Sequence, residues 1–264
     1  MAGLAKEDFR VLDEGEGREI VYFGWEREAL SLVLLLDLSG SMTRYLKPMA
    51  AKAQAALKNL REGDRVAILP FSRRTMTFLE FSEDFGLVER ELRNAIQVTT
   101  LGSGTAINPA VMEAAKYIRE AADVSRGRRA ILIVTDNQGL NYQAPDDQAL
   151  RELYAANAVL SALVVGQGKR PEPLAKGANP DFSPPDVFKL AGETGGEAVK
   201  EDQTDVWFPR MLERIRTRYS IQYHAPRGAA PGTFRRVRVE LTPEANRKHG
   251  RAMVRARAGY WVEY

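Results

Sequence analysis

Short runs that are apolar at almost every position recur along the middle of the chain, separated by stretches with apolar residues at helical spacing. Four such runs lie at 32–36, 65–71, 130–135 and 159–165. A strand without polar positions has no side that faces solvent, which is typical of a parallel sheet covered by helices on both faces. The alternation therefore predicts an α/β fold with a doubly wound, mostly parallel sheet.

The segments between these runs complete the predicted α/β domain. Helices are expected at 45–60, 85–96, 107–122, 149–157 and 205–217. A further strand at 75–81 is expected to form a hairpin with 65–71, and a short strand is expected near 197–199. Segment 169–185 contains five prolines, so it is predicted to be a loop insertion.

The two ends of the chain have a different pattern, in which apolar and polar residues alternate. Such alternation predicts half-buried strands, here at 8–12, 18–23, 219–223, 234–241 and 253–257. The first two are expected to form a β-hairpin. We predict that residues 1–25 and 218–264 pair into a small β-unit beside an α/β domain that covers 26–217.

Composition narrows the class of protein. The chain has 264 residues, 44% of them hydrophobic, and contains no cysteine, which excludes disulfides and thiolate metal sites. No apolar stretch approaches the ~20 residues that a membrane span needs. The start, Met1 to Asp8, lacks the apolar core of a signal peptide, so it fits either a cytosolic start or a chain whose leader was trimmed.

The net charge of +3 is unevenly distributed. From Arg218 to the end there are ten basic and three acidic residues, a net charge of +7. These arginines alternate with apolar residues, as on the exposed face of a strand, and no aromatic platform or recognition helix accompanies them. Nucleic acid is therefore not expected as a partner.

Side chains that carry hydroxyl or carboxylate oxygens lie after two predicted strands and before one predicted helix, all at one edge of the sheet. Asp37, Ser39 and Ser41 come directly after the first buried strand, Thr105 precedes a helix, and Asp136 follows the strand that ends at 135. Ligands of open parallel sheets bind beyond the carboxyl ends of the strands. Hydroxyl and carboxylate oxygens suit Mg²⁺, and neutral hydroxyl ligands leave the ion attractive to a further carboxylate.

This arrangement resembles the metal-ion-dependent adhesion site of von Willebrand factor type A domains. The family pattern is Asp-x-Ser-x-Ser, a distant Thr, and an Asp after the fourth strand, and every element of it is present. The resemblance implies that Ser39, Ser41 and Thr105 reach the ion directly and that Asp37 and Asp136 act mainly through water. It also implies Mg²⁺ as the ion, with Mn²⁺ or Ca²⁺ as alternatives.

The resemblance extends beyond the motif to a bacterial family related to these domains. The segments that carry it are 6–15, 218–223, 234–239 and 254–260. Members are often exported, so a periplasmic or extracellular location is favoured. Two positions depart from the usual pattern: Ser103 stands where Gly is usual, and Asn137 stands where Gly is common. Neither removes a ligand, but both are expected to affect loop geometry.

Other interpretations of these residues explain less. Ser and Asp also cap helices, but a cap does not require Thr105 and Asp136. A phosphatase on a similar sheet would need a second Asp where Ser39 stands. A serine hydrolase needs a base, and His224 and His249 both fall in the predicted C-terminal β-segments, remote from the motif. The chain is therefore not expected to be an enzyme.

The function predicted from the sequence is metal-dependent binding of a protein partner that offers an acidic side chain to the ion. Two alternatives remain open. One is a structural assembly module with a vestigial metal site, in which the basic C-terminal segments mediate assembly. The other is a metal-assisted hydrolase, which the missing base makes a poor fit. The oligomeric state is not predicted.

Overall fold

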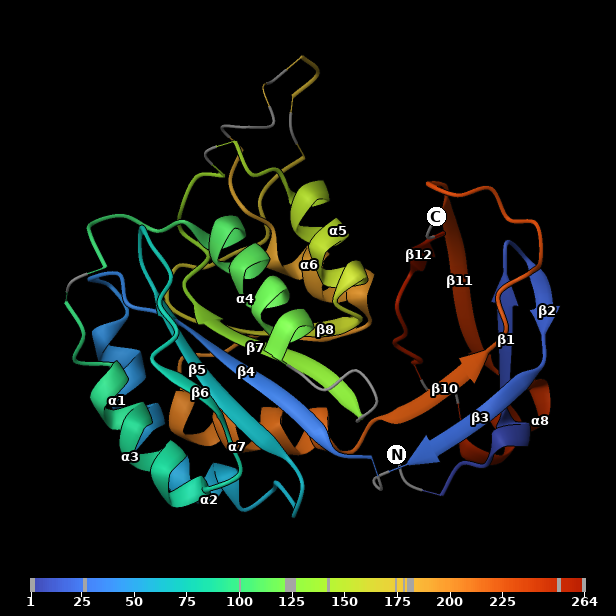
Figure 1. Cartoon of the computed structure of the whole chain (residues 1–264), viewed down its shortest axis with the longest axis horizontal. Helices are drawn as coiled ribbons and strands as arrows, with labels where there is room; N and C mark the ends of the chain where they lie inside the picture. The colour runs from blue at the N-terminus through green and yellow to red at the C-terminus, as the bar shows by residue number, and fades with distance from the viewer. Residues whose placement is uncertain are drawn as a thin grey trace.

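A six-stranded sheet forms the centre of the α/β domain, as the sequence predicts (Figure 1). The computed structural model describes residues 3–25, 28–99, 101–121, 127–141, 143–173, 175–177, 179, 183–250 and 253–262. The strand order is β6-β5-β4-β7-β8-β9, with β6 antiparallel to β5 and all other pairs parallel. The strands are β4 (Leu30–Asp37), β5 (Arg65–Phe71), β6 (Leu79–Ser82), β7 (Arg128–Thr135), β8 (Ala158–Val164) and β9 (Ala198–Lys200).

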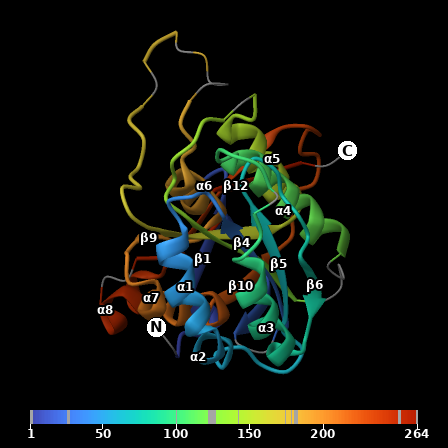
Figure 2. The ribbon, with the colours of Figure 1, turned by 90° about the vertical axis from the view of Figure 1, so that its left-hand side faces the viewer.

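Helices cover both faces of this sheet (Figures 1 and 2). One face carries α1 (Thr43–Ala51), α2 (Ala53–Leu57), α3 (Phe85–Ala95) and α7 (Thr204–Arg216). The other face carries α4 (Ile107–Ala121), α5 (Asp146–Ala155) and α6 (Val187–Thr194). Among the described residues, no helix combines the length and the apolar character that crossing a membrane requires.

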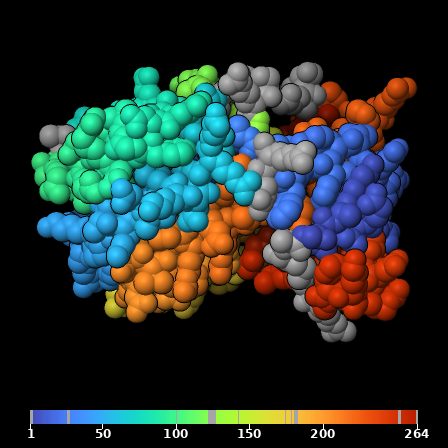
Figure 3. All heavy atoms as spheres, turned by 90° about the horizontal axis from the view of Figure 1, so that it is seen from below, coloured from blue at the N-terminus to red at the C-terminus, as the bar shows by residue number. Residues whose placement is uncertain are grey.

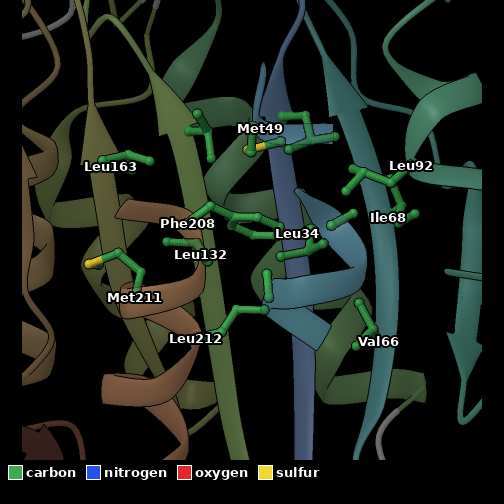
Figure 4. Packing of buried hydrophobic residues seen from close by; sticks show 14 of the residues in the cluster. Leu34, Met49, Val66, Ile68, Leu92, Leu132, Leu163, Phe208, Met211 and Leu212 are labelled. Atoms are coloured by element: carbon green, nitrogen blue, oxygen red, sulfur yellow. The ribbon is translucent and has the colours of Figure 1, made fainter. Parts of the chain in front are cut away.

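Strand β4 is buried at all eight positions, which explains its unbroken apolar pattern. Leu32 and Leu34 point into the cluster beneath α1 and α7, whereas Val33 and Leu35 point into the cluster beneath α4. Figure 4 shows the first cluster, with Leu34 at its centre. The core therefore consists of two apolar layers separated by the sheet.

The predicted helix at 45–60 is two helices, α1 and α2, separated at Lys52. Pro48 lies inside α1 and has no backbone N–H to donate. The Lys52 amide donates to the Met49 carbonyl three residues back, which is a tight turn of the 3₁₀ type.

In segment 169–185, the described residues form neither helix nor strand, as predicted.

The terminal segments pair with each other into a β-unit beside the α/β domain (Figures 1 and 3). A four-stranded sheet has the order β12-β11-β1-β2, and β10 pairs with β3 in a second sheet of two strands. The strands are β1 (Phe9–Asp13), β2 (Glu16–Arg18), β3 (Ile20–Trp25), β10 (Tyr219–Tyr223), β11 (Phe234–Leu241) and β12 (Gly259–Trp261). A 3₁₀ turn, η1 (Lys6–Asp8), precedes β1.

Three details of the β-unit differ from the sequence prediction. The expected hairpin is split, because β1 pairs with β2 while β3 leaves to pair with β10. Residues 253–257, predicted to be a strand, form no regular secondary structure. The last strand, β12, lies further along the chain. The Ala258 amide donates to the Glu193 carbonyl, so this segment is held by α6 rather than by a full ladder.

The third difference is a helix, α8 (Pro243–His249), where β-structure was expected around His249. Thr242 caps it, since the threonine side chain accepts a hydrogen bond from the Ala245 amide at 3.2 Å, and Pro243 occupies the first turn. A hydroxyl residue followed by Pro is a recognised helix start. His249 therefore lies on a helix of the β-unit and not on a strand.

A buried carboxylate, Asp13, links the strands of the β-unit. Its Oδ1 accepts from Arg235 Nε at 2.8 Å, and its Oδ2 accepts from the hydroxyls of Tyr223 at 3.0 Å and Tyr260 at 2.8 Å. Burial alone would raise the pKa of Asp13, but the hydrogen bonds from Arg235, Tyr260 and Tyr223 outweigh it and hold the pKa below its usual value. One side chain therefore joins β1 to β10, β11 and β12.

We predict that Asp13→Asn lowers the free energy of unfolding at pH 7, because Arg235 loses its ion pair and the hydroxyls of Tyr223 and Tyr260 lose a charged acceptor. A carboxyl whose pKa is lowered by folding stabilises the folded state when the pH is above its unfolded-state pKa of ~4. This stabilisation is lost as the pH falls below that value. Urea unfolding at several pH values should show the gap between the two proteins closing below pH ~4. Asp147→Asn, the same change at an exposed position, is the control.

Candidate metal centre

The candidate site lies where β4 and β7 end side by side. Asp37, the last residue of β4, is fully buried, and Thr135 ends the neighbouring parallel strand. The Thr135 hydroxyl donates to Asp37 Oδ2 at 2.7 Å, and the Ser39 amide donates to Asp37 Oδ1 at 2.9 Å. Both carboxylate oxygens are therefore held by neutral donors.

The two serines connect Asp37 to the second carboxylate. The hydroxyl oxygens of Ser39 and Ser41 are 3.3 Å apart, and the Ser41 hydroxyl donates to Asp136 Oδ2 at 2.5 Å. Ser41 is exposed and Ser39 half-buried, whereas both carboxylates are buried. Four of the five residues predicted from the sequence thus form one group, with hydroxyls on the outside and carboxylates beneath.

Thr105, the fifth residue, lies on a loop whose backbone packs against the loop that follows β7. A side chain at Gly139, in the loop after β7, would place its Cβ 2.7 Å from the Thr105 carbonyl oxygen, so the two loops pack together there. Among the described residues, no hydrogen bond joins the Thr105 hydroxyl to Ser39, Ser41 or the carboxylates. The structure therefore packs the Thr105 loop against the loop that follows β7, and a role for the Thr105 hydroxyl stays a prediction.

The Thr105 loop is anchored by Ser72, which sequence reasoning missed. The Ser72 hydroxyl lies within donating distance of two carbonyls of this loop, Gly102 at 2.8 Å and Gly104 at 2.7 Å, and the Ala106 amide donates to the Ser72 carbonyl at 2.9 Å. Ser72 directly follows β5. Ser72 could have been predicted to lie near the site, because the run at 65–71 was expected to end at the same edge of the sheet as Asp37.

Thr135 was the second residue missed. Besides holding Asp37, its hydroxyl accepts a hydrogen bond from the Asn137 amide at 3.0 Å, so it fixes the start of the following loop. A hydroxyl residue ending a strand beside a buried carboxylate is the signal that would have identified it.

The Asn137 position explains one departure from the family pattern. Its φ of 53° lies in the left-handed region, which favours Gly but which Asn tolerates. Its side chain donates to the Lys169 carbonyl at 3.0 Å, and the Gln138 amide donates to Asp136 Oδ1 at 3.0 Å. Asn therefore adopts the conformation that Gly would provide and adds a tie to the loop after β8.

The electrostatics of the group favour a cation. Burial raises the pKa of Asp37 to about 6, against the lowering effect of the hydrogen bonds from Thr135 and Ser39, and the nearby charge of Asp136 raises it further. Two buried carboxylates share this site without a basic partner in their hydrogen bonds. A positive ion placed over them would offset both the desolvation and the repulsion.

The donor set fits Mg²⁺ or a similar hard cation. Such ions take hydroxyl, carboxylate and water oxygens. The described residues hold no group of three or more His, Cys, Asp or Glu side chains, so a centre built from imidazole or from three carboxylates is not present among them. If a divalent ion is bound at this edge of the sheet, Ser39, Ser41 and Asp136 are the residues already placed to hold it.

Residues 32–138 match the family model of the von Willebrand factor type A domain, which confirms the resemblance drawn from the motif. The matched segment includes all five candidate residues. No curated protein matches the chain. The extension of the resemblance to a bacterial family across the terminal segments stays a prediction.

Solved structures with the same fold include an aerotolerance-related membrane protein from Bacteroides fragilis, at 18% identity and a TM-score of 0.52, covering 71% of this chain and 98% of that one. A von Willebrand factor type A protein from Catenulispora acidiphila is 15% identical, with a TM-score of 0.52 over 81% and 51% of the two chains. Proximal thread matrix protein 1 from mussel byssus, with a zinc-occupied adhesion-site motif, is 14% identical, with a TM-score of 0.57 over 77% and 50%. At these identities the likeness shows the fold.

We predict that Thr135→Val lowers the free energy of unfolding of the metal-free chain by about 1–3 kcal/mol, because buried Asp37 loses a donor and the Asn137 amide loses its acceptor. Urea unfolding in the presence of a chelator measures this. Thr77→Val makes the same chemical change at an exposed threonine and should be close to neutral. Equal stability of the Thr135 variant and the wild type would show that the hydroxyl does not hold the carboxylate.

Proposed function

We propose that the von Willebrand factor type A domain matched by residues 32–138 binds one divalent cation, Mg²⁺ or alternatively Mn²⁺ or Ca²⁺, and through it a protein partner. The observation that carries this proposal is the hydrogen-bonded group in which Ser41 bridges from Ser39 to Asp136. The partner offers an acidic side chain to the ion. The match to the family and the chemistry of the donors support the same conclusion.

The proposed roles are those that the family resemblance implies, and the burial of the serines and the carboxylates agrees with them. Ser39, Ser41 and Thr105 provide neutral hydroxyl ligands on the open side of the site. Asp37 and Asp136, which lie deeper, hold water molecules of the ion and balance its charge. Because the direct ligands are neutral, the ion keeps enough positive charge to attract a carboxylate from outside.

Binding rather than catalysis is the proposed activity. Neither histidine of the chain lies at the site: His224 follows β10 and His249 lies in α8, both in the β-unit. The hydrogen bonds of the group involve hydroxyls, amides and carboxylates, and neither histidine of the chain is among them to act as the imidazole base of a serine hydrolase. An exported location, periplasmic or extracellular, is part of the proposal and rests on the family resemblance.

We predict that calorimetric titration of the chelator-treated chain with Mg²⁺ or Mn²⁺ gives one bound ion per chain. The double variant Asp37→Ala/Asp136→Ala should lose this binding, because the ion then has no carboxylate to balance its charge. Asp147→Ala/Glu62→Ala removes two exposed carboxylates outside the site and is the charge-matched control. Circular dichroism of all three proteins checks that they are folded.

Absence of binding at millimolar metal in the folded wild type would contradict the proposal and favour a structural module with a vestigial site. If the ion binds, capture of candidate partner proteins with and without chelator tests the second half of the proposal. The expected result is capture that disappears with chelator and in the Asp37/Asp136 variant but persists in the control. Capture that chelator leaves unchanged would exclude metal-mediated binding of that partner.

A further inference from the structure

A cleft of about 1020 Å³ lies among the described residues between the α/β domain and the β-unit. It reaches the start of β7 at Arg128 and Arg129 and the start of β8 at Ala158. The candidate metal site lies at the opposite ends of these strands. An eight-residue strand spans about 26 Å, so the cleft is a separate site.

One wall of the cleft is an apolar face of the four-stranded sheet. On β11 only alternate residues line it, namely Val237, Val239 and Leu241, and Val11 contributes from the neighbouring β1. Alternate residues of a strand share one face, so these side chains point into the cleft together. Val237 and Val239 are only half-buried, so this face is not fully covered.

A second wall is an open strand edge. Every residue from 217 to 223 lines the cleft, whereas a wall made by one face of a strand would include only every second residue. Within the described part of the chain, β10 pairs with no strand other than β3. In Figure 1, β10 leads from the α/β domain into the β-unit. Its second edge thus faces the cleft with backbone groups that another strand could pair with.

The cleft is strongly basic. Six arginines line it, Arg128, Arg129, Arg214, Arg218, Arg255 and Arg257, against two carboxylates, Glu28 and Glu197. Four of the six donate to neutral groups: Arg128 to carbonyls at the end of α7, Arg129 to the Ala156 carbonyl, Arg218 to the Gly195 carbonyl, and Arg257 to Asn157 Oδ1 and the Gly259 carbonyl. The other two, Arg214 and Arg255, share one carboxylate, Glu197. Burial lowers the pKa of Arg218, and the charge of Arg255 lowers it further. An anion entering the cleft would compensate this charge.

We propose that the cleft binds an extended segment of a partner protein in which acidic and apolar residues alternate. The segment adds as a third strand beside β10, its apolar side chains face Val237 and Val239, and its carboxylates face the arginines. A two-stranded sheet is marginal by itself, and an added strand satisfies backbone groups along its edge. The apolar wall, the open edge and the basic lining each favour this one occupant.

The probe is a fluorescently labelled peptide of eight residues in which Glu and Val alternate, and the measurement is fluorescence anisotropy with the full chain. Binding is expected, and three altered peptides should bind at least tenfold more weakly. They are one with Lys in place of Glu, one with the same residues in two blocks, and one with N-methylated backbone amides. The first tests charge, the second alternation, and the third strand pairing.

Two variants locate the binding on the protein. Arg255→Glu reverses an exposed charge in the cleft and should weaken binding at least tenfold. Arg236→Glu makes the same change at an exposed position on the opposite face of β11 and should leave binding within twofold. Val239→Thr keeps the shape of the side chain but makes the wall polar, and should weaken binding several-fold.

The proposal is independent of the metal site, so chelator and the Asp37→Ala/Asp136→Ala variant should leave peptide binding unchanged. Binding that chelator abolishes would assign the peptide to the metal site and overturn the proposal for the cleft. Equal binding of the alternating and block peptides, equal effects of Arg255→Glu and Arg236→Glu, or no binding at all would also overturn it.

Discussion

The burial of β4 along its whole length is the constraint on which the rest of the structure depends. Helices cover both faces of the sheet, so a polar side chain within a central strand would lack water and, in most positions, a partner. Within the described strands β4, β5, β7 and β8, charged side chains therefore occur only at the two ends. At one end lie the loops that carry Asp37 and Asp136. At the other end the sheet meets the β-unit and the basic cleft.

Asp37 shows what this confinement costs. A carboxylate at the end of a fully buried strand is poorly solvated, and its pKa rises to about 6 even though two neutral donors hold it. If the role of the residue were only to cap the following turn, an Asn or Ser would accept the same amide without a buried charge. The carboxylate is easier to explain if a cation offsets its charge, which is why the electrostatics and the motif support one proposal.

The sequence specified the α/β domain well, because its signals are local and strong. An apolar run as short as 65–71, with the turn residues Gly63 and Asp64 before it, favours a buried strand over a helix, and β5 has these same bounds. That Asp37, Ser39, Ser41 and Asp136 lie together could be predicted because they follow strand ends, where topology brings them to one edge, whereas metal binding by them stays a prediction. Ser72 and Thr135 were missed because they act on the loops through hydrogen bonds and belong to no recognised motif.

The terminal segments were harder, because their structure depends on distant partners. The alternation at 253–257 predicts a strand, yet the backbone near Ala256 packs against Gly195 so closely that no side chain fits there. That contact joins residues about sixty positions apart, and local alternation carries no information about it. Helix α8, in contrast, has a local start signal at Thr242 and Pro243. It was not predicted because the surrounding C-terminal segments alternate as strands do.

The fold also constrains how the two proposed sites could be used together. The α/β domain is joined to β10 through the end of α7, where buried Arg216 pairs with buried Asp64 at 2.7 Å and Asp64 also accepts the Leu30 amide at 2.8 Å. This ties α7 to the start of β4, and the cleft and the candidate metal site lie at opposite ends of the strands of one sheet. A single acidic side chain cannot serve both sites across about 26 Å. If both proposals hold, two separate acidic segments, from one long partner or from two, would be needed to occupy the two sites.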